Sequence, residues 1–320
     1  MLSIIKKQST TFSNSPTQAS FANATQTLSL EAQNTKPNAH LSIGEVIDGK
    51  YEVVKEFYQN SKEGLFLTSH FTTKQTFLVK AVYKDSPDFN AATIMQEFQR
   101  FRSLTYQGIP AAIDIVDRAQ MFLIVFQHNE GDFLQDIISR GDLLSEAEII
   151  DYAIQLCSIL EYLHTAVPAT SFHAINPRNI IICPNKQLVF LAFLCQRQKN
   201  DDVEKDKNSL GALFYTAPEV LSASQATDIR TDIFSFGATF YSLITRSDPA
   251  LPPHAVYPLR DRRPELSKGF EYIINKCMEA EPDKRYQNID ALLRDLKSVD
   301  KITGKLSRQD KIHSFLKRNK

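Results

Sequence analysis

The sequence predicts an α+β fold in which a β-rich part with one main helix precedes a larger helical part. Strand-like segments alternate with one helix up to about Phe126, and patterns of helical spacing follow. The chain has 320 residues, 42% of them hydrophobic, which is enough to bury a large core. Its 37 basic and 37 acidic residues balance, so nothing in the overall charge indicates a nucleic-acid partner.

The expected elements of the β-rich part follow a polar N-terminal segment. Residues 1–43 are rich in Ser, Thr, Asn, Gln and Ala without periodicity, so we expect them to be disordered. Lys50–Phe57 is the first expected strand, and the apolar run Phe77–Val82 predicts a buried strand that carries Lys80. A helix is expected around Glu97.

The helical part begins at Leu144, where Ser145 is the expected N-cap of a helix that continues to Leu163. Asp232–Thr245 and Ile289–Val299 show the same spacing. The longest apolar run, Leu188–Cys195, predicts a buried strand and is far shorter than the ~20 residues that span a membrane. The four cysteines lack C-x-x-C spacing, so neither a zinc site nor a disulfide framework is predicted, and we expect a reducing cytoplasm.

Several short motifs occur in a fixed order along this frame. They are Val79-Lys80, Glu97, Phe172-His173-Ala174-Ile175-Asn176-Pro177-Arg178-Asn179, Ala217-Pro218-Glu219, Asp232-Ile233-Phe234-Ser235-Phe236-Gly237 and Arg285. Together they resemble the signatures of a bacterial-type Ser/Thr protein kinase over about residues 44–298. The resemblance implies two lobes, with a small lobe over 44–130, a large lobe over 131–299 and a basic C-terminal tail over 300–320.

The positions that carry the family's chemistry are changed. The resemblance places Ala174 at the catalytic aspartate, Asn176 at the catalytic-loop lysine and Ala212 at the threonine that joins these groups. Ala192 stands at the metal-binding aspartate of the D-F-G motif, and a methyl group cannot ligate magnesium. The resemblance therefore implies a catalytically inactive member, a pseudokinase, with no intact catalytic residue and no metal site.

The nucleotide-binding positions are also changed. Tyr58, Asn60 and Glu63 stand where the glycine-rich loop is expected, although a register shifted by one residue would let Gly64 supply a turn. At the adenine pocket the resemblance implies Leu65 and Leu78 above the ring and Phe126 as the gatekeeper at the back. These side chains are larger than the valine and alanine usual there, so we expect them to fill the nucleotide slot.

Some positions are retained. Lys80 and Glu97 are expected to form an ion pair, either as a brace of the small lobe or as a residual nucleotide contact. Asn179 is expected as a turn residue that bonds the backbone, or as a weak magnesium ligand. Glu219, Asp232 and Arg285 are expected to hold the large lobe together whether or not the chain is a catalyst.

Three functions follow from these expectations. The first is a catalytically inactive scaffold or allosteric partner of an active kinase or another regulated enzyme, without a cofactor. The second is a Ser/Thr kinase or another nucleotide-dependent transferase of weak, atypical activity, and the third is a sensor that binds ATP without turnover. ATP and magnesium belong only to these alternatives. The basic tail predicts either an ordinary solvated end or a weak contact with an anionic surface.

Overall fold

The computed structural model describes residues 40–87, 89–166, 175–194, 214–221, 228–246 and 257–318, apart from the side chains of residues 194 and 310–318. Ala174 and Ala212 lie outside these residues. The same holds for the N-terminal residues 1–39, of which disorder was predicted.

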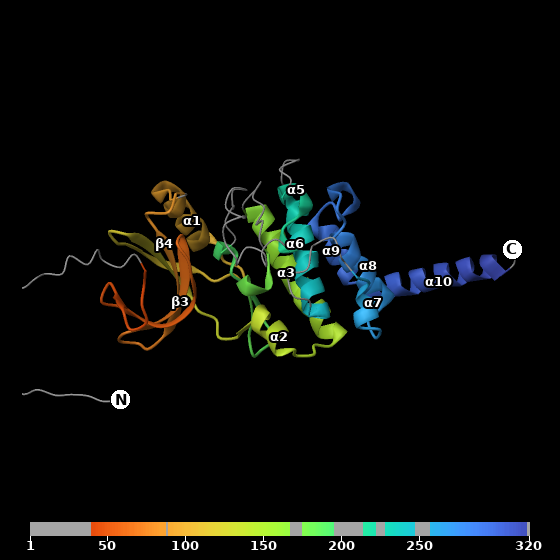
Figure 1. The fold of residues 1–320 in the computed structure, drawn as a ribbon, viewed down its shortest axis with the longest axis horizontal. Helices are drawn as coiled ribbons and strands as arrows, with labels where there is room; N and C mark the ends of the chain where they lie inside the picture. The colour runs from red at the N-terminus through yellow and green to blue at the C-terminus, as the bar shows by residue number, and fades with distance from the viewer. Residues whose placement is uncertain are drawn as a thin grey trace, which may run out of the picture. The chain divides into compact units, whose positions relative to one another are not determined.

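The small lobe is a six-stranded antiparallel sheet with one helix, shown in orange and yellow in Figure 1. Its strand order is β1-β2-β3-β4-β6-β5. The elements are β1 (Val46–Ile47), β2 (Tyr51–Gln59), β3 (Glu63–His70), β4 (Thr76–Tyr83), α1 (Ala91–Ser103), β5 (Ala112–Asp117) and β6 (Met121–Gln127). The expected strands at Lys50–Phe57 and Phe77–Val82 are therefore confirmed as β2 and β4.

Both faces of this sheet are buried, and alternate residues of each strand belong to different cores. One face, with Leu65, Leu78 and Phe126, joins a hydrophobic core that continues into the large lobe. The other face, with Phe66 and Val79, packs in a separate core within the small lobe. Leu41 belongs to this second core and is 1% exposed, so the packed chain begins before residue 44.

The large lobe is mainly helical, with a three-stranded sheet of order β7-β8-β9 where the chain enters it. Its first elements are β7 (Asp132–Phe133), α2 (Leu134–Arg140), α3 (Glu146–Ala166), η1 (Pro177–Asn179), β8 (Ile180–Ile182), β9 (Leu188–Phe190) and η2 (Ala192–Leu194). The strand predicted over Leu188–Cys195 is thus shorter, because the chain turns into η2 after Leu191. The remaining elements are α5 (Pro218–Leu221), α6 (Ile229–Thr245), α7 (Leu259–Arg262), α8 (Lys268–Cys277), η4 (Pro282–Lys284), α9 (Ile289–Leu296) and α10 (Val299–Arg318).

Local sequence explains where the main helices begin. Ser145 Oγ accepts a hydrogen bond from the Glu148 backbone N–H, and the Glu148 carboxylate accepts one from the Ser145 N–H, so the predicted cap of α3 is confirmed. Asp228 caps α6 by accepting from the Arg230 N–H at 2.8 Å. Helix α6 is buried from Thr231 to Ile244. Its buried Thr231, Ser235 and Thr239 hydroxyls are accommodated by hydrogen bonds. The α+β fold with a β-rich small lobe and a helical large lobe is confirmed.

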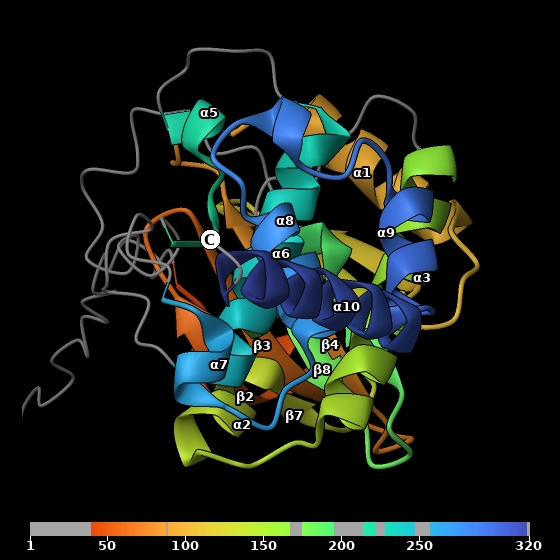
Figure 2. The ribbon, with the colours of Figure 1, turned by 90° about the vertical axis from the view of Figure 1, so that its right-hand side faces the viewer.

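The basic tail forms helix α10 as far as Arg318. Helix α10 leads away from α8 and α9 in Figure 1 and crosses α8 in Figure 2. It is anchored at Gly269, whose N–H donates to Thr303 Oγ1 at 2.9 Å and whose lack of a side chain lets the two helices approach. Among the described residues, no helix combines the length and the apolar character needed to cross a membrane.

Candidate functional site

Lys80 lies at the junction of the two lobes, where the resemblance places a phosphate-binding lysine. Its side chain is 1% exposed. Its ammonium donates to the Phe193 carbonyl oxygen at 2.8 Å, and Nζ lies 3.3 Å from Glu63 Oε2. A buried ammonium needs such partners, because removing it from water without them is unfavourable by several kcal/mol. Lys80 is thus held between β3 and the A-F-L segment that replaces D-F-G.

The ion pair predicted between Lys80 and Glu97 is wrong. Within the part of the chain that the structure describes, Glu63 is the carboxylate paired with Lys80, and Glu97 lies half-buried on α1 without an ion pair to Lys80. The physical reason is that the Lys80 ammonium is already satisfied by the Glu63 carboxylate and the Phe193 carbonyl. Helix α1, which carries Glu97, makes its most extensive contacts with β5.

Glu63 reaches Lys80 because of the register of two strands. Leu65 on β3 is the direct partner of Lys80 on β4. Glu63 precedes Leu65 by two residues, so its side chain lies on the same face of the sheet and diagonally opposite Lys80. The motif alignment assigns Glu63 to a glycine position and therefore misses its pairing with Lys80. That pairing depends on the register between β3 and β4, which the alignment does not give.

The turn between β2 and β3 is closed by an asparagine rather than by glycines. Asn60 Oδ1 accepts from the backbone N–H groups of Lys62 at 2.8 Å and Glu63 at 3.0 Å. The Asn60 N–H donates to the Glu63 carbonyl at 2.9 Å. Gly64 lies within β3 opposite Gln59, so the shifted register that would give it the turn is not adopted. A glycine-rich loop offers backbone N–H groups to phosphate, and here two of them bind a side chain of the same turn.

The side chains expected at the adenine end belong to a single core. Leu65, Leu78 and Phe126 are each at most 1% exposed. The rings of Phe126 and Phe193 are stacked, with centroids 3.6 Å apart and planes inclined by 8°. Phe101 of α1 meets both rings edge-on at 6.2 Å. The A-F-L phenylalanine therefore packs directly on the gatekeeper position.

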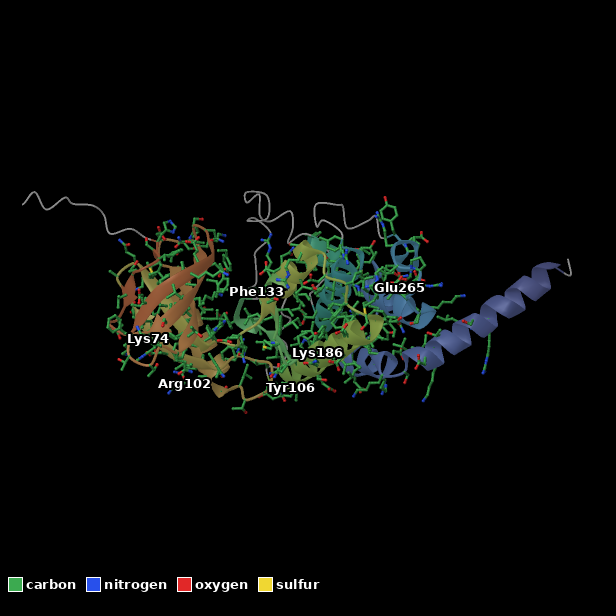
Figure 3. The ribbon with its side chains drawn as sticks, turned by 90° about the horizontal axis from the view of Figure 1, so that it is seen from below. Lys74, Arg102, Tyr106, Phe133, Lys186 and Glu265 are labelled. Atoms are coloured by element: carbon green, nitrogen blue, oxygen red, sulfur yellow. The ribbon has the colours of Figure 1, made fainter. Side chains whose placement is uncertain are left out.

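A second aromatic contact joins the lobes nearby. The ring of Phe57 on β2 lies edge-on to that of Phe133, with centroids 5.0 Å apart. Phe133 is labelled in Figure 3 and belongs to β7, where it pairs with Ile181 of β8. The partly buried rings of Phe57 and Phe133 pack against the same core as Leu65 and Leu78.

The side-chain oxygens of Asn176 and Asn179 accept hydrogen bonds from the backbone of the turn that contains them. Asn179 Oδ1 accepts from the Asn176 N–H at 3.0 Å, and Asn176 Oδ1 accepts from the Arg178 N–H at 2.9 Å. The expectation that Asn179 is a turn residue that bonds the backbone is therefore confirmed. The Asn179 carbonyl also accepts from the Leu191 N–H at 2.8 Å, which ties this turn to the strand end before Ala192.

The metal-binding aspartate position is occupied by Ala192, which is 2% exposed and packed in the core. A methyl group offers no oxygen ligand, and magnesium requires oxygen ligands. Among the described residues, no group of three or more His, Cys, Asp or Glu side chains is arranged to hold a metal ion.

Glu219 and Arg285 form the predicted scaffold pair. Arg285 Nη1 and Nη2 each donate to one oxygen of Glu219, both at 2.7 Å, and the arginine also donates to the carbonyls of Glu279, Arg230 and Ala280. Burial raises the pKa of Glu219, but the hydrogen bonds led by those of Arg285 outweigh it and leave the pKa below the usual value of a glutamate. The pair is thus charged and joins α5 to the loop after α8.

Asp232 is fully buried at the start of α6 and lies 2.8 Å from His164 Nε2 of α3. Sequence reasoning identified Asp232 as part of the scaffold but missed His164. The position of His164 on α3, in the last turn of a helix already predicted to Leu163, gave no sign of a distant aspartate.

Comparisons with known proteins agree with this geometry. A model of the protein kinase domain matches residues 64–296. A probable serine/threonine-protein kinase of Streptomyces coelicolor is 26% identical over 230 residues, which cover 66% of this chain and 34% of that protein. Serine/threonine-protein kinase PrkC of Bacillus subtilis is 22% identical over 271 residues, covering 80% of this chain and 41% of that protein.

The chain thus spans only part of the length of these relatives. Among solved structures, the kinase domain of PknI from Mycobacterium tuberculosis matches with a TM-score of 0.62 and 17% identity, covering 81% of this chain and all of that domain. The fold, the order of the motifs and the extent of the match lead to one conclusion. The chain belongs to the protein kinase domain family.

Proposed function

We propose that this chain is a protein kinase-fold protein that does not transfer phosphate and acts by binding, as a scaffold or an allosteric partner of another protein such as an active kinase or a regulated enzyme. One observation carries the proposal. The side chains at the expected adenine end, Leu65, Leu78 and Phe126, belong together with Phe193 to one buried core that continues from the small lobe into the large lobe.

The energy of that packing supports the proposal. Fully burying a leucine or phenylalanine side chain is worth about 1.5–3 kcal/mol. An adenine ring could enter only by displacing several of these side chains, and the displaced groups would lose both burial and contacts. The contacts that ATP makes would therefore have to offset the free energy lost when these side chains are displaced.

The chemistry of the described residues supports it as well. Phosphoryl transfer relies on metal ions and cationic groups that neutralise charge on the phosphates. Ala192 offers no ligand, the Asn179 side-chain oxygen already accepts from the Asn176 N–H, and Lys80 is paired with Glu63. These residues therefore fit a magnesium–nucleotide group poorly.

A binding and transfer assay tests the proposal on the full chain. Thermal denaturation is followed with ATP or ADP, with and without magnesium or manganese, and transfer of radiolabelled phosphate to the chain and to a general protein substrate is measured alongside. We expect no nucleotide-dependent shift and no label above that of a Lys80→Met, Asn179→Ala control. A metal-dependent shift with label that the control lacks would overturn the proposal.

A second candidate is weak Ser/Thr protein kinase activity. The relatives favour it, since they are named as serine/threonine-protein kinases, and Lys80 matches the family's motif. The same transfer assay decides between the two. Nucleotide binding without transfer would instead indicate the third possibility, an ATP sensor.

A further inference from the structure

The phosphate end of the expected nucleotide slot contains a carboxylate from the chain itself. Glu63 Oε2 lies 3.3 Å from Lys80 Nζ, and Lys80 is 1% exposed whereas the Glu63 side chain is 23% exposed. The pair therefore joins a buried cation to an anion that is partly exposed to solvent. An anion from solution that approached Lys80 would have to compete with Glu63.

The other carboxylate oxygen of Glu63 is held separately. Tyr58 Oη donates to Glu63 Oε1 at 3.1 Å. The backbone of Glu63 is fixed on both sides by Asn60, which accepts from its N–H at 3.0 Å and donates to its carbonyl at 2.9 Å. Glu63 is thus positioned by its own turn and by β2, with Oε2 3.3 Å from the Lys80 ammonium. A flexible surface glutamate has no such support.

The same turn offers little to an external anion. The N–H groups of Lys62 and Glu63 donate to Asn60 Oδ1. These are backbone donors of the kind that a glycine-rich loop directs at phosphate. The two backbone donors of this turn are therefore used within the turn itself. The negative charge beside Lys80 is provided by Glu63.

We propose that Glu63 is a built-in substitute for a phosphate group, and that replacing its carboxylate turns Lys80 into a binding site for an inorganic polyphosphate. The inference deepens the proposed function, because it rests on the nucleotide slot being closed, and it assigns the closure of the phosphate end to one side chain. It does not depend on the adenine end, since an inorganic anion has no ring to place between Leu65 and Leu78.

The test uses the full chain, tripolyphosphate as the probe and thermal denaturation at constant ionic strength. Four proteins are compared: the wild type, Glu63→Gln, Glu63→Gln with Lys80→Met, and the control Glu56→Gln, which removes an exposed carboxylate from the neighbouring strand. We expect Glu63→Gln to melt about 5 °C or more below the wild type, because the buried ammonium loses its counter-charge. Tripolyphosphate should recover most of that loss in Glu63→Gln and shift the other three by less than about 1 °C.

A second variant covers the case in which Glu63→Gln does not fold. Tyr58→Phe removes only the hydroxyl that holds Glu63 Oε1, so the carboxylate remains but is less restrained. We expect a smaller tripolyphosphate response, still above that of the wild type. The inference is overturned if the wild type responds as strongly as the variants, if folded Glu63→Gln does not respond, or if the response persists without Lys80. None of these results depends on ATP binding or phosphate transfer, so they are separate from a failure of the proposed function.

Discussion

Replacing Leu78 with alanine tests directly whether this side chain fills the adenine end. Leu78 is fully buried on β4, opposite Leu67 on β3, and lies on the sheet face that joins the large-lobe core. Adenosine is the suitable ligand for this test. It carries the ring but no phosphate, so the Glu63–Lys80 pair does not affect the result.

The expected magnitudes follow from burial. A fully buried Leu→Ala change lowers the free energy of unfolding by about 2.7–5 kcal/mol. In a domain of this size each kcal/mol corresponds to roughly 2–4 °C in Tm, so Leu78→Ala should melt about 5–20 °C below the wild type. Adenosine at about 100 times its Kd would return about 2.7 kcal/mol, or roughly 5–10 °C.

The matched control is Leu123→Ala. Leu123 is equally buried, but it lies on β6 in the separate core of the small lobe. Differential scanning calorimetry with and without adenosine should show similar losses for both variants and a recovery only for Leu78→Ala. An adenosine shift in the wild type, or equal responses of the two variants, would refute the reasoning that Leu78 occupies the ring site.

Three further outcomes are expected from the scaffold. Arg285→Leu leaves the Glu219 carboxylate buried without its counter-charge, so urea denaturation should show a free energy of unfolding lower by about 3–5 kcal/mol. A decrease below about 1 kcal/mol would contradict the buried pairing. The pKa of Glu219 is lower in the folded chain than its ordinary value of 4.5, so the unfolded chain binds more protons in this range. The stability that this pair contributes is therefore fully present above pH 4.5 and is lost as the pH falls through the folded-state pKa. Stability measured against pH should therefore fall less steeply in Glu219→Gln than in the wild type over this acidic range. Ser145→Ala removes the acceptor at the start of α3 and should lower the free energy of unfolding by about 1 kcal/mol, as measured by urea denaturation, with Ser139→Ala as the exposed control.

The elements predicted best are those specified by local sequence. The strand that carries Lys80, the cap at Ser145 and the buried helix α6 were all predictable, because alternation, capping residues and helical spacing act over a few residues. The pairing of Glu219 with Arg285 was predictable from the resemblance and is found as a bidentate contact. Each of these depends on a pattern that is visible along the chain.

The features that sequence reasoning missed depend on how distant elements pack. The pairing of Lys80 with Glu63 depends on the register between β3 and β4, which a motif alignment does not contain. The contact between His164 and Asp232 joins residues 68 positions apart. Similarly, the stack of Phe193 on Phe126 requires the A-F-L segment to meet a strand of the other lobe.

The partner of Lys80 changes what its presence means. A lysine at this position is usually taken as a sign that nucleotide binding is preserved. Here its buried ammonium is satisfied by the Glu63 carboxylate and the Phe193 carbonyl. A cation at position 80 therefore stabilises the folded chain even when no nucleotide is bound. Removing Lys80 alone would leave the Glu63 carboxylate without its counter-charge and the Phe193 carbonyl without its donor. A Lys80→Met variant should therefore lose stability in the absence of any nucleotide, and such a loss is no evidence of an ATP site.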